Sequence, residues 1–111
     1  MRGRHASLRA APIDLSACTR RGVVVSAGTG SPYAPAELTW GLVLAAMRHI
    51  PQEAARLRAG SWQSTLGTGL RGRTLGIWGY GKIGTLVAGY GRAFGMNVLV
   101  WGREGSLSRA R

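Results

Sequence analysis

The sequence has few acidic residues and almost no cysteine. Its 111 residues include 15 lysines and arginines but only 4 aspartates and glutamates, for a formal net charge of +11. The single cysteine, Cys18, excludes an intramolecular disulfide and a thiolate metal cluster, and this cysteine usage is typical of a reducing compartment. We therefore expect a cytoplasmic protein without a metal site.

Long hydrophobic runs are also missing. The longest apolar stretch, residues 38–47, is about half of the roughly 20 residues that a membrane-spanning helix needs. Residues 1–12 lack the apolar region of a secretory signal; they are arginine-rich and free of acids, which leaves a short organellar transit peptide as the less favoured alternative. We expect a disordered terminus over residues 1–12 and no membrane partner.

The excess of positive charge raises the question of a polyanionic partner. The arginines are spread singly or in pairs along the chain, and they neither line one helix nor alternate with aromatic residues. Solvated surface charge is therefore the default interpretation, and a nucleic-acid partner is not favoured. Adventitious polyanion binding stays open, and strong salt dependence would be its signature.

The first two thirds of the chain predict helices around one short strand. A helical turn is expected at residues 14–19, and the β-branched run Val23–Val25 predicts a buried strand that ends in a loop. A helix is expected from Pro35 to about Met47, and it is apolar on nearly every side. Another domain or subunit should cover it. A second short helix is expected over residues 51–60.

The last third predicts a strand, a helix and a second strand. Leu75–Trp78 is a short apolar run, Lys82–Phe94 has the spacing of a helix with one buried face, and Met96–Trp101 is again strand-like. Two strands joined by one helix are typical of parallel pairing. The pattern therefore predicts an α/β fold.

A glycine motif lies between the first of these strands and the helix. The run Gly79-Tyr80-Gly81-Lys82-Ile83-Gly84 matches G-x-G-x-x-G, the phosphate-binding fingerprint of dinucleotide-binding Rossmann domains. Its three glycines are expected to allow the turn, the approach of the pyrophosphate and the close packing of the helix, in that order. Backbone N–H groups of Lys82 and Ile83 would then bind the pyrophosphate. The alternative is a glycine-rich turn without a ligand.

The end of the second strand bears on the choice of cofactor. NAD enzymes place an acidic residue there to bind the ribose 2′-hydroxyl, whereas this chain has Gly102 followed by Arg103. An arginine without that carboxylate suits a 2′-phosphate, so NADP is modestly favoured over NAD. Glu104 could still reach the ribose.

Several motifs together resemble the D-isomer-specific 2-hydroxyacid dehydrogenases. The resemblance rests on Ala36-Glu37-Leu38-Thr39, on Gly60-Ser61-Trp62, on the run from Gly67 through Gly84, and on Phe94-Gly95-Met96. It implies a partial Rossmann unit, a doubly wound parallel sheet, over residues 73–111. Residues 13–34 would be a remnant of the substrate domain, and residues 35–72 an interdomain helix and its connection.

The departures from the family pattern limit the expected function. The catalytic arginine, glutamate and histidine of the family lie downstream of the second strand, so this chain is expected to be a truncated, NAD(P)-binding fragment without catalysis. In the parent family the chemistry is 2-keto acid reduction by hydride transfer. The alternative is a non-catalytic interaction module that forms a homodimer, or a dimer with a full-length relative, through the helix at residues 36–49.

Overall fold

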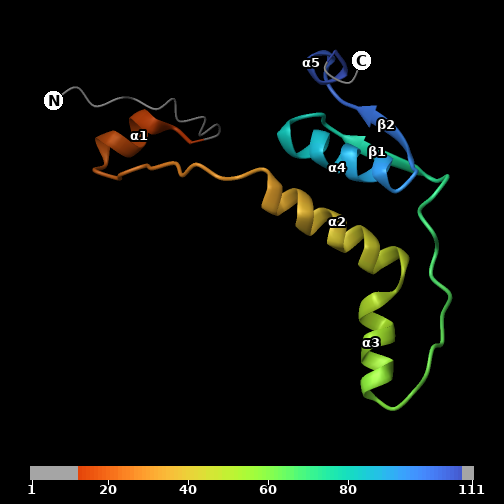
Figure 1. Ribbon diagram of the computed structural model, residues 1–111. Coiled ribbons are helices and arrows are strands. Elements are labelled where there is room, and N and C mark those ends of the chain that lie inside the picture. Colours follow the sequence, from red (N-terminus) through yellow and green to blue (C-terminus); the bar gives the residue numbers. More distant parts are fainter. Residues whose placement is uncertain (1–12, 109–111) are drawn as a thin grey trace. The chain divides into compact units, whose positions relative to one another are not determined.

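The chain divides into two units, with the boundary between Gly30 and Ser31. The computed structural model describes residues 13–108, so the predicted terminus at residues 1–12 lies outside the described residues (Figure 1). The first unit contains one short helix, α1 (Leu15–Arg20). The Asp14 side chain caps it by accepting a hydrogen bond from the Ala17 N–H at 3.0 Å, as expected for an aspartate at an N-cap.

The prediction of a strand at Val23–Val25 is wrong. The backbone there has no regular structure, and the Val24 side chain is 91% exposed. The Val23 N–H donates to the Cys18 carbonyl at 2.9 Å and so closes the turn that follows α1. A β-branched run forms a strand only where a second strand pairs with it, and the described part of this unit contains no second strand.

The second unit begins with two helices joined by a tight elbow. Helix α2 (Tyr33–Met47) starts slightly before the predicted Pro35, and α3 (Ile50–Arg58) carries a proline in its first turn. Between them His49 has φ +54°, a left-handed conformation that is uncommon for a non-glycine residue. The elbow turns the chain sharply, as Figure 1 shows.

The predicted strand, helix and strand are confirmed. They are β1 (Thr74–Trp78), α4 (Lys82–Ala93) and β2 (Asn97–Trp101), followed by a short helix α5 (Glu104–Leu107) that the sequence did not predict. The two strands are parallel, and Trp78 pairs with Trp101 in the register. Among the described residues β1 pairs with β2 alone, so its other edge is open.

A small core forms where α2 packs against α4 and its sheet. Trp40 of α2 is 8% exposed, and its ring lies 5.0 Å from that of Phe94 and 6.1 Å from that of Tyr90. Ala36, Leu70 and Val87 complete the buried cluster. This packing fixes α2 beside the helix that carries the glycine motif.

Two apolar surfaces remain outside this core. On α2, Leu38 and Leu42 are more than half exposed, which agrees with the expectation that the chain itself cannot cover this helix. On the sheet, the face that points away from α4 exposes Trp78, Leu99 and Trp101. Within residues 13–108, the helices are all too short or too polar to cross a bilayer.

Candidate functional site

The glycine motif forms the turn from β1 into α4. Gly79 follows the last strand residue with φ +92°, a conformation that side chains with a Cβ rarely adopt. Its N–H donates to the Trp101 carbonyl at 2.7 Å, which ties the turn to the carboxyl end of β2. The motif and the end of the second strand therefore lie next to each other.

Gly84 is the point of closest contact between α4 and the turn. A Cβ built on Gly84 would overlap the Gly79 carbonyl oxygen and would lie 3.3 Å from the Ile77 side chain. The backbone oxygen cannot move away without shifting the turn itself. The requirement for glycine at this position follows from the packing, in agreement with the role expected for the third glycine of the motif.

The amino end of α4 has no side-chain cap. Gly81 is its N-cap in an extended conformation, no side chain caps the helix end, and a Cβ at Gly81 would meet nothing within 4 Å. The Gly81 carbonyl accepts two hydrogen bonds within the helix, one from the Thr85 N–H at 3.0 Å and one from the Thr85 hydroxyl at 2.8 Å. The first N–H groups of a helix, here those of Lys82 and Ile83, have no hydrogen-bond partner within the helix.

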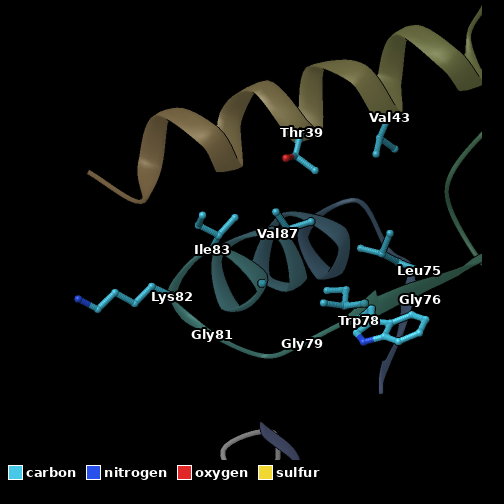
Figure 2. A pocket seen from close by; sticks show the side chains of 12 residues that line it. Thr39, Val43, Leu75, Gly76, Trp78, Gly79, Gly81, Lys82, Ile83 and Val87 are labelled. Carbon is cyan, nitrogen blue, oxygen red and sulfur yellow. The ribbon is translucent and has the colours of Figure 1, made fainter. Parts of the chain in front are cut away.

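The side chains of the motif point in different directions. Tyr80 is buried at 7% exposure, Lys82 is exposed, and Ile83 is 43% exposed. Figure 2 shows the Lys82 side chain extending away from α4, while Ile83 points toward α2. The Lys82 side chain is therefore exposed to solvent at the start of α4.

The residues predicted to meet the ribose lie at the end of β2. Gly102 is half-buried, and Arg103 is exposed as the N-cap of α5. The hydrogen bond from Gly79 to Trp101 brings Gly102 beside the motif. The structure therefore gathers the predicted site residues at one end of the sheet.

A cleft of about 620 Å³ runs from the glycine motif along the open edge of β1. Its walls are apolar and come from three elements, α2, β1 and α4: Thr39, Val43, Leu75, Ile77, Ile83 and Val87. Figure 2 shows Thr39 and Val43 facing the cleft from α2. The apolar walls suit hydrophobic groups, and Gly81 and Lys82 of the glycine motif also belong to the lining.

Sequence reasoning missed the contribution of α2 to this cleft. Thr39 and Val43 read only as part of an apolar helix, because their position beside β1 depends on how α2 packs on α4. Trp78 and Trp101 end the two predicted strands, but the sequence did not predict the edge-to-face contact of their rings, whose centroids are 4.1 Å apart at an angle of 80°. The described residues contain no cluster of histidine, cysteine or carboxylate groups that could hold a metal ion.

Comparison with known proteins identifies the family. Residues 40–110 match the family model of the D-isomer specific 2-hydroxyacid dehydrogenase NAD binding domain. D-3-phosphoglycerate dehydrogenase of Methanocaldococcus jannaschii is 47% identical over 90 residues, which cover 78% of this chain and 17% of that protein. Glyoxylate reductase of Aeropyrum pernix is 41% identical over 102 residues, which cover 83% of this chain and 30% of that protein.

Solved structures give the same result. A putative D-3-phosphoglycerate dehydrogenase from Ralstonia solanacearum is 64% identical with a TM-score of 0.80, and a phosphoglycerate oxidoreductase from Vibrio cholerae is 55% identical with a TM-score of 0.83. Each match covers 88% of this chain and 32% of the other, so the chain spans about a third of their length. The Rossmann-type fold and the glycine motif agree with the matched domain, and the chain belongs to the D-isomer specific 2-hydroxyacid dehydrogenase family, in its NAD binding domain.

Proposed function

We propose that this chain binds the pyrophosphate of NAD(P) at the amino end of α4. The observation that carries the proposal is the open, uncapped helix end at Gly81, beside a turn that Gly79 and Gly84 hold close to the sheet. Backbone N–H groups and the helix dipole together favour an anion at such a position. The site residues are Gly79, Tyr80, Gly81, Lys82, Ile83 and Gly84, with Gly102 and Arg103 at the ribose.

We further propose that the site prefers NADP to NAD. Gly102 brings no carboxylate to the end of β2, and Arg103 next to it is exposed and has no ion-pair partner among the described residues. A guanidinium that no carboxylate neutralises attracts the 2′-phosphate that distinguishes NADP from NAD. Glu104 is also exposed there, so the preference is expected to be modest.

The oxidoreductase activity belongs to the longer proteins of the family. In our proposal the parent reaction is hydride transfer between the nicotinamide and a small 2-hydroxy or 2-keto acid, in the cytoplasm. The site proposed above, Gly79 to Gly84 with Gly102 and Arg103, contains no histidine or carboxylate, the side chains that most often exchange a proton with a substrate. We therefore propose that the 111 residues bind cofactor without turnover, and 2-keto acid reduction by the purified chain would contradict this.

Calorimetric titration with NADPH and NADH tests the cofactor proposal. The unmodified chain is expected to bind NADPH more tightly than NADH. Gly102→Asp introduces the carboxylate that NAD enzymes have at the end of the second strand. It should shift the ratio of the two affinities toward NADH by about tenfold, which corresponds to a change of roughly 1.4 kcal/mol in relative binding free energy. Equal ratios for the chain and for Gly102→Asp would show that Gly102 does not face the ribose.

Dimerisation through the helix at residues 36–49 is the second candidate function. It is favoured by the exposure of Leu38 at 66% and Leu42 at 62% on the side of α2 that α4 does not cover. Trp40, by contrast, is buried inside the unit, so replacing it would test the core and not the interface. Light scattering should show a dimer for the unmodified chain and a monomer for Leu38→Gln with Leu42→Gln. A monomeric unmodified chain would contradict this candidate.

A further inference from the structure

Three arginines from two separate segments of the chain lie together at the amino end of the sheet. Arg71 and Arg73 lie just before β1, and Arg92 lies in the last turn of α4. The Gly72 N–H donates to the Gly95 carbonyl at 2.9 Å, and the Gly95 N–H donates to the Arg92 carbonyl at 2.9 Å. In Figure 1 this is the end where the chain enters β1 and where α4 leads into β2. These three arginines form the surface that we call the arginine end.

The side chains of the arginine end are exposed, and neighbouring groups restrain two of them. The Arg73 Nε donates to the Gly69 carbonyl at 3.1 Å, which holds this guanidinium while its two terminal nitrogens stay available. The aliphatic part of the Arg71 side chain packs over Gly95, where a Cβ would lie 3.1 Å from the Arg71 Cγ. Side chains that are already restrained lose less conformational entropy when they bind a ligand.

Among the residues that the structure describes, no acidic side chain forms an ion pair with the arginine end. Glu104 lies on α5, which follows the opposite end of the sheet. Glu53 accepts hydrogen bonds from the Ser64 and Thr65 hydroxyls at 2.9 and 2.7 Å. Glu37 on α2 is exposed and pairs with none of the three arginines. Three positive charges therefore gather here without a neutralising partner in the described part of the chain.

The arginine end is separate from the glycine motif. β1 runs from Thr74 to Trp78, so its two ends are about 13 Å apart at roughly 3.3 Å per residue. Helix α4 separates Lys82 from Arg92 by about 15 Å at roughly 1.5 Å per residue. The proposed cofactor site lies at the carboxyl ends of the strands and makes no use of these arginines. Any ligand of the arginine end is therefore additional to the dinucleotide.

We propose that the arginine end binds the phosphate backbone of single-stranded nucleic acid without sequence preference. Each guanidinium can bind a phosphate through two N–H groups, and three separate guanidiniums match an anion that repeats along a chain. The formal net charge of +11 adds long-range attraction for the same polyanion. Phe94, two residues beyond Arg92, is 46% exposed and offers an aromatic surface to an unpaired base. This combination favours nucleic acid over an acidic protein segment.

Fluorescence anisotropy of a labelled oligothymidylate of about twelve nucleotides tests the proposal on the full chain. The logarithm of the binding constant should fall linearly with the logarithm of the salt concentration, with a slope of about 0.7 for each phosphate contact. The triple variant Arg71→Gln, Arg73→Gln and Arg92→Gln should therefore lower this slope by about 2 and weaken binding at least about tenfold near about 0.1 M salt. An unmodified chain that does not bind, or a triple variant with an unchanged slope, would overturn the proposal.

A second triple variant separates a local surface from the net charge of the chain. Arg21→Gln, Arg56→Gln and Arg58→Gln remove the same number of charges from exposed arginines outside the arginine end. This control should keep the slope of the unmodified chain and most of its affinity. Equal losses in the two triple variants would show that only net charge attracts the oligonucleotide, and the proposal would be wrong.

Two competition experiments identify the ligand and the site. Saturating NADPH should leave oligothymidylate bound, because the two sites lie at opposite ends of the sheet; displacement by NADPH would place the oligonucleotide at the glycine motif and overturn the proposal. Polyglutamate of equal charge should compete poorly, and equal competition would assign the surface to an acidic protein segment instead. If the triple variant of the arginine end lost its helical circular dichroism, Arg92→Gln alone would decide, with an expected loss of about 0.7 in slope.

Discussion

A methyl group added at Gly84 should be costly, although alanine is the better helix former. Gly84 lies in the first turn of α4, where a Cβ would overlap the Gly79 carbonyl oxygen and approach the Ile77 side chain to 3.3 Å. Overpacking of this kind costs about 1–3 kcal/mol, while replacing a helical glycine by alanine gains up to about 1 kcal/mol. We expect Gly84→Ala to be destabilised by about 0–3 kcal/mol in total.

Gly89 in the same helix provides the matched control. It is exposed, and a Cβ there would meet nothing within 4 Å, so Gly89→Ala should be stabilised by up to about 1 kcal/mol. The difference between the two variants isolates the contact with Gly79 at about 1–3 kcal/mol, or roughly 4–8 °C in melting temperature for each kcal/mol. Thermal unfolding followed by circular dichroism measures this difference. Equal stabilisation of both variants would refute the close packing of α4 on the turn.

Three further predictions concern other parts of the structure. Gly79→Ala should destabilise the chain by about 1–2 kcal/mol in urea unfolding, because its φ of +92° strains any residue with a Cβ. Trp40→Ala should cost about 3–5 kcal/mol and remove most of the helical signal, whereas the exposed Trp62→Ala should change stability by less than about 0.5 kcal/mol; similar effects would contradict the core assignment. The hydroxyls of Thr65 and Ser64 donate to the Glu53 carboxylate and, with the backbone N–H groups, lower its pKa from 4.5 to about 2. This group therefore stabilises the fold fully above pH 4.5 and loses its contribution as the pH falls toward 2, so unfolding midpoints of Glu53→Gln should vary less with pH in that range than those of the unmodified chain.

The part of the fold that the sequence predicted correctly is the part determined by local patterns. The residues of β1, α4 and β2 carry their own periodicity, and the glycine motif marks the turn between the first two. Val23–Val25 has an equally strong strand pattern, yet it forms no strand, because pairing depends on a partner that no local pattern reveals. Strand propensity was a necessary condition there and not a sufficient one.

For the candidate site, the sequence likewise predicted only those residues that are close together along the chain or are brought together by strand pairing. Gly79 through Gly84 are contiguous, and parallel pairing of two five-residue strands brings Gly102 beside them. Thr39 and Val43 reach the cleft through the packing of Trp40 on Tyr90 and Phe94, a tertiary contact that spacing does not encode. The relative orientation of the Trp78 and Trp101 rings likewise depends on side-chain packing that no sequence pattern reveals.

Backbone amide chemical shifts during an NADPH titration test the central claim most directly. Pyrophosphate binding at the amino end of α4 predicts that the largest saturable shifts occur at the amides of Gly81, Lys82 and Ile83, with smaller shifts at Gly102 and Arg103. These shifts should disappear in Gly81→Asp and remain in Gly89→Asp, which places the same charge on an exposed part of the same helix. Shifts confined to scattered arginines, or shifts that persist in Gly81→Asp, would contradict a dinucleotide site at the glycine motif.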